Sequence, residues 1–186
     1  MQNKFHMIHQ DAFSSGQISS KLWLCEQLEQ TGWTSNLTYI YGGWYGITAF
    51  LLLSRNNFKV DQIQSFDIDP SCEPIADMIN ENWVWQDWKF KAYTLDCNGY
   101  VRGNPDLIIN TSTEHFDSFL WWDNIKPGTA VALQGNNMQH DDHVNNTNSL
   151  DEFCEQFPLA QEIYRGSMDF NYPNWSFSRY MVIGIK

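Results

Sequence analysis

The feature that most constrains the fold of this chain is a short apolar run that leads directly into a glycine turn and then into a second apolar run. Leu37–Tyr41 is apolar and β-prone, the segment Gly42–Gly46 reads GGWYG, and Ile47–Leu53 is almost entirely apolar. Glycines between two such runs mark a tight turn, because they adopt backbone conformations that other residues disfavour. The pattern predicts a buried strand, a turn and a buried helix.

The alternation of strand and helix repeats along the rest of the chain. Further strands are predicted at Asp61–Phe66, Lys89–Leu95, Pro105–Asn110, Thr129–Gln134, Gln161–Ser167 and Arg179–Ile185, and further helices at Ser19–Gln30, Pro74–Asn82, Phe116–Trp122 and Leu150–Phe157. Strands that alternate with helices favour a mostly parallel sheet with both faces covered, because parallel neighbours need crossover connections. We expect one α/β domain over residues 1–186, with residues 1–36 as an N-terminal helical cover and Gln134–Ser149 as one long loop.

Chemically informative residues stand where these predicted strands end. Gly42 and Gly43 follow the first strand, Asp67 the second and Asp96 the third. Glycines let backbone amides approach a ligand that a Cβ would block, and an acid about 20 residues later can accept hydrogen bonds from both ribose hydroxyls. The pattern predicts an adenosine-containing ligand. The alternatives are that the turn only connects two elements and that Asp67 or Asp69 only caps the helix near Pro74.

In the order of these motifs the chain resembles the class I S-adenosylmethionine-dependent methyltransferases, from about Leu37 to Lys186. The resemblance implies a three-layer Rossmann-like methyltransferase fold with a mostly parallel sheet and a C-terminal antiparallel hairpin, here Gln161–Lys186. It also implies that the cofactor is S-adenosylmethionine. The residues that it places at the cofactor are Tyr41, Gly42, Gly43 and Gly46 of the glycine motif, Asp67 at the ribose, Ile68, Asp96 and Cys97 at the adenine, and Asn110 at the end of the fourth strand.

The segment after the fourth strand carries polar groups where this family keeps its acceptor chemistry. His115 is the candidate catalytic base because its unperturbed pKa of about 6.5 suits proton transfer near neutral pH. Glu114 is the second candidate, and Asn110 would orient the acceptor. Family members that methylate amino groups carry two prolines and an aromatic residue after the first position, whereas this chain has Thr111–Thr113. The alternative is that Glu114 and His115 are solvated at a helix N-terminus.

Three further groups of residues have two interpretations each. Lys21 could pair with the carboxylate of the cofactor, or it could be an exposed first-turn lysine of a helix capped by Ser19 or Ser20. The stretch His140–His143 reads HDDH, and we expect a polar lid there and no metal ion, because adjacent residues rarely reach one ion with suitable geometry. The tryptophans could bind a cationic acceptor or pack in the core; they include Trp83, Trp85, Trp88, Trp121 and Trp122.

The charge of the chain bears on its partners. Asp and Glu total 22 against 11 for Lys and Arg, so the formal net charge is -11. Such a field repels phosphate backbones, which favours a small-molecule acceptor over nucleic acid. The four cysteines lack metal or redox spacing, and no run approaches the roughly 18 apolar residues of a membrane span, so we expect a cytoplasmic protein that does not enter a membrane.

The predicted function is therefore transfer of a methyl group from S-adenosylmethionine to an acceptor that the sequence does not identify. A nicotinamide-dependent dehydrogenase would need the pattern G-x-G-x-x-G, which the segment Gly42–Gly46 does not supply. Another adenosine-ligand enzyme and a non-catalytic binding module on the same fold remain the alternatives.

Overall fold

The strand, turn and helix expected around residues 37–53 are present in the computed structural model, which describes residues 8–55 and 57–186. Within these residues, the chain forms a seven-stranded sheet in the order β3-β2-β1-β4-β5-β7-β6. The first five strands are parallel, and β7 runs antiparallel to both β5 and β6. The strands are β1 (Thr34–Tyr41), β2 (Lys59–Asp67), β3 (Phe90–Thr94), β4 (Leu107–Asn110), β5 (Ala130–Asn136), β6 (Gln161–Tyr172) and β7 (Trp175–Ile185).

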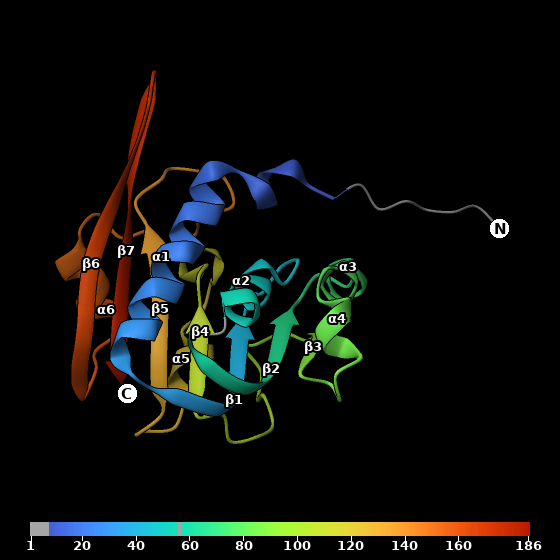
Figure 1. Ribbon diagram of the computed structural model, residues 1–186. Helices are drawn as coiled ribbons and strands as arrows, with labels where there is room; N and C mark the ends of the chain where they lie inside the picture. Colours follow the sequence, from blue (N-terminus) through green and yellow to red (C-terminus); the bar gives the residue numbers. More distant parts are fainter. Residues whose placement is uncertain (1–7, 56) are drawn as a thin grey trace.

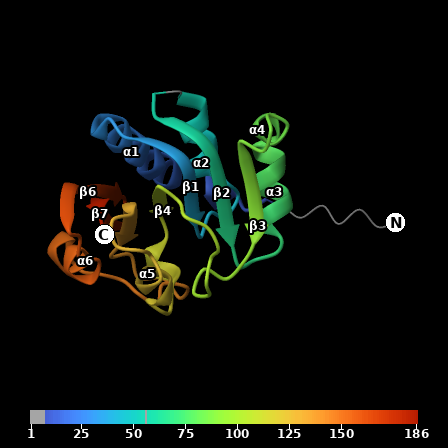
Figure 2. The same cartoon turned by 90° about the horizontal axis from the view of Figure 1, so that it is seen from below.

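Helices cover both faces of the sheet, as Figure 2 shows from below. One face carries α1 (Ser15–Thr31), α2 (Ile47–Arg55), α3 (Cys72–Ile79) and α4 (Glu81–Val84), and the other carries α5 (Leu120–Asp123) and α6 (Leu150–Gln156). Side chains alternate along each strand, so Ile40 and Ile109 join one apolar core while Tyr39 and Ile108 join the other. The three-layer α/β architecture with a C-terminal antiparallel hairpin is therefore confirmed.

The parallel strands bring their carboxyl ends to one edge of the sheet. Tyr41, the last residue of β1, pairs with Phe66 of β2 and with Asn110 of β4. The residues that follow these positions consequently emerge side by side at that edge, which is uppermost in Figure 1. The 3-10 helix η1 (Gln10–Phe13) and the start of α1 lie across it.

The helix of the N-terminal cover is longer than the sequence predicts. It begins at Ser15, and the Ser14 hydroxyl accepts a hydrogen bond from the Gln17 amide at 3.3 Å, so neither Ser19 nor Ser20 is the cap. The expected cover extended to residue 36, but β1 already begins at Thr34. The part of the cover formed by residues 1–7 lies outside the described residues.

Two predicted helices are shorter than expected. The segment Phe116–Trp122 is not one helix, because the chain is extended at Phe116. The helix α5 begins only at Leu120, whose amide donates a hydrogen bond to the Ser118 hydroxyl at 3.1 Å. The helix expected at Pro74–Asn82 breaks at Asn80, whose side-chain amide donates to the Ala76 carbonyl.

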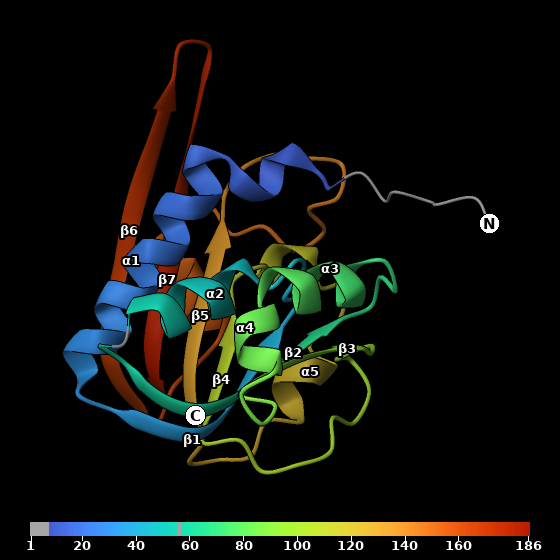
Figure 3. The ribbon, with the colours of Figure 1, turned by 45° about the vertical axis from the view of Figure 1, so that its right-hand side comes forward.

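The C-terminal strands are longer than expected. Beyond the sheet, β6 and β7 continue as a hairpin that projects past the start of α1 (Figure 3). Phe170 stacks on Phe177 there, with their ring centroids 4.8 Å apart. On the other side of β7, β5 continues to Asn136, which pairs with Arg179, so the predicted loop begins at residue 137 and not at Gln134. In the residues that the structure describes, no helix is long and apolar enough to cross a membrane.

Candidate functional site

A cavity of about 730 Å³ opens at the carboxyl ends of the parallel strands. Its walls come from the turns after β1, β2, β3 and β4, from the loop 137–149, and from η1 and α1. The predicted site residues that line it are Lys21, Gly42, Gly43, Asp67, Ile68, Asp96, Cys97, Glu114 and His115. The fold therefore brings nine of the predicted positions to one hollow.

Packing inside the protein requires glycine at two positions of the turn, before any ligand is considered. Gly42 has a φ of +59°, and a Cβ there would lie 2.5 Å from the hydroxyl oxygen of Ser112. A Cβ on Gly43 would lie 1.9 Å from the hydroxyl oxygen of Ser65. A side chain at Gly43 would therefore collide with β2 whether or not a ligand is bound.

Asp67 holds the glycine turn in place and is not a helix cap. Its Oδ2 accepts a hydrogen bond from the Trp44 amide at 2.8 Å, and its Oδ1 accepts one from the Asp69 amide at 3.0 Å. The N-cap position of α3 is Ser71. Trp44 has a φ of +48°, which is unusual for a bulky residue, so the bond from Asp67 supports a strained position.

The two large residues of the glycine turn anchor the N-terminal cover. Trp44 and Tyr45 stack with ring centroids 5.0 Å apart. Together with Ile75, they pack against Ala12 of η1. The aromatic residues at these positions therefore fix the segment that closes the top of the cavity.

Two exposed aliphatic side chains form an apolar strip beside the acids. Ile68 is 67% exposed and Leu95 is 38% exposed, and both line the cavity. Asp96 and Cys97 lie next to them, and burial raises the pKa of Cys97 to about 12, so its thiol is neutral. Leu95 was not predicted from the sequence, although an apolar residue directly after β3 was a usable signal.

Three predicted residues, Tyr41, Gly46 and Asn110, lie behind the residues that line the cavity. Tyr41 is buried against Phe66, and Gly46, with a φ of +71°, directly precedes α2. Asn110 is fully buried, and its Oδ1 accepts a hydrogen bond from the Ser112 amide at 3.0 Å. These three residues shape the turns that line the cavity, and their direct contact with a cofactor stays a prediction.

At the end of β4 the cavity wall contains a buried charge cluster. Glu114 is 2% exposed, and its Oε1 accepts a hydrogen bond from the Asn136 side-chain amide and lies 3.7 Å from Nη1 of Arg179. Arg179 also donates to the Thr111 carbonyl at 3.0 Å. The alternative of a solvated Glu114 is therefore wrong. The sequence did not point to Asn136, which falls in the predicted loop, or to Arg179, which begins the last predicted strand.

Lys21 enters the same cluster from α1. It is buried, and it donates a hydrogen bond to the side-chain oxygen of Gln17. Burial and the nearby Arg179 charge lower the pKa of Lys21 to about 7. The alternative of an exposed first-turn lysine is therefore wrong. The helix starts at Ser15, six residues before Lys21, and Lys21 faces the cavity.

The loop 137–149 brings His143 to the end of β4. The amides of Val144 and Asn145 donate to the Glu114 carbonyl at 2.9 and 3.1 Å. The rings of His115 and His143 then meet edge to face, with centroids 4.7 Å apart, and burial lowers the pKa of His143. His140 and His143 both line the cavity with their ring centroids 5.5 Å apart, and His143 also has a ligating atom within 4.8 Å of one each from Glu114 and His115.

Comparisons with known proteins identify the architecture. No protein-family model and no curated protein matches the sequence. The N-methyltransferase NodS from Bradyrhizobium japonicum is similar over 91% of this chain and 96% of its own, with 12% identity and a TM-score of 0.67. The magnesium protoporphyrin IX methyltransferase ChlM from Synechocystis covers 99% of this chain and 86% of its own, with 10% identity and a TM-score of 0.68. The chain has the class I methyltransferase fold.

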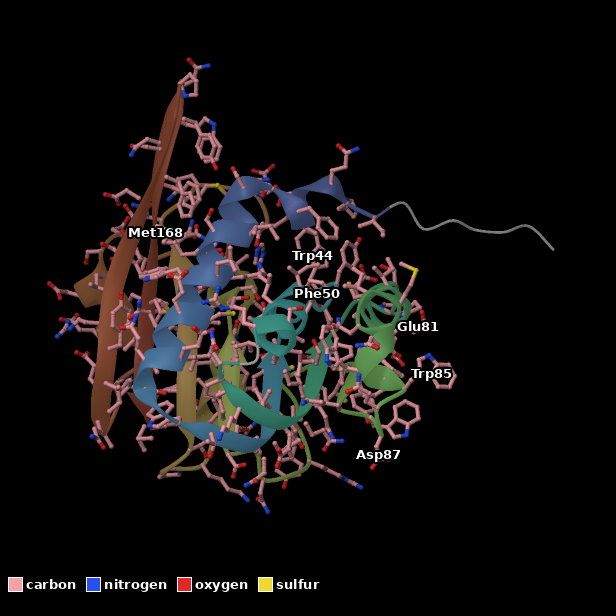
Figure 4. The ribbon with its side chains drawn as sticks, viewed as in Figure 1. Trp44, Phe50, Glu81, Trp85, Asp87 and Met168 are labelled. Carbon is pink, nitrogen blue, oxygen red and sulfur yellow. The ribbon has the colours of Figure 1, made fainter. Side chains whose placement is uncertain are left out.

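The large aromatic residues of this methyltransferase fold do not form one face toward an acceptor. Trp121 and Trp122 are buried in the core, and Trp85 is 79% exposed. Figure 4 shows Trp85 and Asp87 projecting outward beyond α4, whereas Trp44 lies below the N-terminal segment. The predicted alternative of core packing therefore holds for the pair Trp121 and Trp122, and Trp85 lies away from the cavity.

Proposed function

We propose that this protein is an S-adenosylmethionine-dependent methyltransferase that acts on a small molecule. The observation that carries the proposal is that the glycine turn, Asp67 and Asp96 meet in one cavity that continues to Glu114 and His115. Structures of the same fold support it, because NodS has been crystallised with S-adenosylhomocysteine and ChlM with S-adenosylmethionine.

The residues present fit each part of this cofactor. The cavity volume of about 730 Å³ lies in the usual range of small-molecule sites. The Asp67 carboxylate would bind the ribose hydroxyls, and the exposed faces of Ile68 and Leu95 would hold the adenine. Lys21 and Arg179 supply positive charge in the same cavity for the cofactor carboxylate.

The bound cofactor supplies a methyl group on a positively charged sulfur. A lone pair of the acceptor forms a bond to the methyl carbon as the carbon–sulfur bond breaks, so the protein has mainly to align the two molecules. A proton on the acceptor would pass to His115. The Nδ1 atom of that ring lies 3.1 Å from the Asp142 carbonyl, which leaves Nε2 with the lone pair in the neutral ring.

Charge favours a small acceptor. Asp11, Asp117 and Asp142 line the cavity along with Glu114, and the formal net charge of the chain is -11. A nucleic acid would have to bring its phosphates against these carboxylates. The four cysteines are unpaired, as is usual in a reducing compartment, and we place the protein in the cytoplasm.

A thermal-shift screen tests the proposal. The chain is melted with S-adenosylmethionine, S-adenosylhomocysteine, NAD or ATP, each at the same concentration. A ligand at about 100 times its Kd adds about 2.7 kcal/mol of stability, so the first two should raise the melting temperature clearly. A shift with NAD or ATP alone would support a different adenosine-ligand enzyme, and no shift with any of the four would contradict the proposal.

A further inference from the structure

Three side chains at the end of β4 have an arrangement that the methyltransferase fold alone does not explain. One ligating atom each from Glu114, His115 and His143 lies within 4.8 Å of the other two. Glu114 and His115 belong to η2 (Thr113–His115), and His143 comes from the loop 137–149, more than twenty residues further along the chain. All three residues line the cavity. A set of ligands drawn from two fixed segments is typical of a binding site rather than of a solvated face.

Hydrogen bonds set both imidazole rings for coordination. Nδ1 of His115 lies 3.1 Å from the Asp142 carbonyl oxygen, and Nδ1 of His143 lies 2.8 Å from the Met138 carbonyl oxygen. A carbonyl only accepts, so Nδ1 carries the hydrogen in each ring and Nε2 keeps its lone pair in the neutral form. Metal-binding histidines are commonly oriented by such bonds from the ring nitrogen that does not bind the ion.

Glu114 supplies a carboxylate oxygen that the protein leaves without a donor. Its Oε1 accepts from Asn136 and faces Arg179, whereas its Oε2 is buried and has no hydrogen-bond partner among the residues described. Leaving a buried carboxylate oxygen unsatisfied is costly, so such an atom in a native fold indicates a missing partner. A cation bound by Oε2 is a partner of the right charge.

We propose that Glu114, His115 and His143 bind a divalent first-row transition-metal ion at the wall of the cavity. Two imidazoles and one carboxylate suit zinc, manganese, iron or cobalt, whereas magnesium and calcium prefer oxygen ligands alone. Three protein ligands leave at least one coordination position open. Because all three residues line the cavity, that position is available to a molecule bound there.

The surrounding charges are compatible with a bound cation. Arg179 lies beside Oε1 of Glu114 rather than among the three ligands. The carboxylates of Asp11 and Asp142 also belong to the cavity wall. The sequence analysis interpreted His140–His143 as a polar lid without a metal ion, and the proposed site takes only His143 from that stretch.

The consequence for the acceptor rests on the proposed function. An ion in this place would occupy Nε2 of His115, so this ring would then hold the ion and would not take the acceptor's proton. The ion would take an oxygen or nitrogen atom of the acceptor into its open position and hold it at the end of β4, and it would lower the pKa of that group so that the proton leaves to water. The substrate class is then a small molecule with a metal-binding hydroxyl, carboxylate or amine next to the atom that is methylated. A bond between the ion and the acceptor would hold the acceptor in line with the methyl group, and such alignment is what an in-line displacement most needs.

Cobalt provides the direct test, because its visible absorption reports the number and type of its ligands. The full chain is stripped with a chelator and titrated with Co²⁺ alone, without cofactor, and Zn²⁺ is then added as a competitor. We expect one tight site with an absorption spectrum of low coordination number and without a thiolate-to-cobalt band, since no cysteine belongs to the cluster. Zn²⁺ should displace the cobalt.

Matched variants locate the site. His143→Asn keeps a donor for the Met138 carbonyl but removes Nε2, and we expect it to weaken Co²⁺ binding at least about 100-fold, as we expect for His115→Asn. His140→Asn, in the same loop, is the control and should leave Co²⁺ affinity within about threefold of the parent. Circular dichroism melts of each variant show that the fold is retained.

The outcomes separate this proposal from the proposed function. Three results would each overturn the metal site. The first is Co²⁺ binding that is no tighter than binding to an unstructured peptide, and the second is a thiolate-to-cobalt absorption band. The third is an equal loss of Co²⁺ affinity in His140→Asn and His143→Asn. The Co²⁺ titration needs no cofactor, and the thermal-shift screen needs no metal. A protein that binds S-adenosylhomocysteine but not Co²⁺ would therefore refute the metal site alone, and the reverse result would refute the methyltransferase alone.

Discussion

Replacement of Asp67 by asparagine tests the cofactor half of the site most sharply. In the free protein, the two carboxylate oxygens of Asp67 accept from the backbone amides of Trp44 and Asp69 at 2.8 and 3.0 Å. Alanine would remove both bonds and release the turn, so a loss of ligand binding could then come from unfolding of the turn. Asparagine keeps the shape and one acceptor oxygen while it removes the charge.

The size of the effect follows from the bonds that Asp67 would make. Hydrogen bonds to a charged group contribute about 1.5 to 3 kcal/mol each, and two ribose hydroxyls would donate to this carboxylate. Because asparagine keeps one neutral acceptor oxygen, the loss lies between one such bond and both, about 1.5 to 6 kcal/mol, which corresponds to a roughly 10- to 10⁴-fold weaker affinity for S-adenosylhomocysteine. The free energy of unfolding without ligand should fall by much less, because one backbone amide keeps its acceptor.

Titration calorimetry with S-adenosylhomocysteine measures the affinity, and thermal melts without ligand measure the stability. Asp69→Asn is the matched control, since Asp69 accepts from the Ser71 amide at 2.8 Å and lies outside the cavity lining. An Asp67→Asn variant with the parent affinity and a normal melt would show that this acid only supports the turn.

Three further substitutions have expected outcomes. Gly43→Ala should lower stability by about 1 to 3 kcal/mol in urea unfolding, because its Cβ would lie 1.9 Å from the Ser65 hydroxyl, and adding Ser65→Ala should recover part of the loss. Lys21 has its pKa lowered to about 7 from 10.5, so the unfolded chain binds more protons between these values and stability rises with pH across that window. Lys21→Met should remove this rise in melts between pH 7 and 10, and an unchanged pH slope would contradict the low pKa. His115→Asn should reduce kcat about 10²- to 10⁴-fold without weakening S-adenosylhomocysteine, and an unchanged kcat would show that alignment alone carries the reaction.

The placement of the glycine turn and of Asp67 at one edge of the sheet could be predicted from the sequence because backbone rules govern it. The glycine turn and Asp67 follow apolar runs whose period marks them as strands, and parallel strands necessarily bring such positions to one edge. Element boundaries were less predictable. Asn80 interrupts a regular apolar pattern through a side-chain bond to the Ala76 carbonyl, and no periodicity reveals such a bond.

The acceptor half could be predicted only in part because tertiary pairing assembles it. Glu114 and His115 were recognised by their place after β4, but Asn136 and Arg179 reach Glu114 only because β5 and β7 pair in one register. In the sequence, Asn136 falls in the long polar loop and Arg179 begins the last predicted strand. His143 arrives through backbone bonds of the loop to the Glu114 carbonyl, which leave no mark in the composition of the loop.

The two halves of the site should therefore respond differently to substitution. Around Gly43 and Asp67 the side chains are packed or bonded to the backbone, so changes that weaken ligand binding should also weaken the fold. Around Glu114 the protein buries Lys21 and Arg179 in one wall, at a cost in desolvation that the fold itself does not require. Apolar replacement of Lys21 is expected to raise stability near neutral pH while it removes a charge from the cavity, because its lowered pKa shows that the fold disfavours the protonated form. At Lys21, an apolar replacement would then raise stability while it lowers activity, whereas at Asp67 a replacement would lower both ligand affinity and stability. This contrast would indicate that the charge cluster is retained for its chemistry.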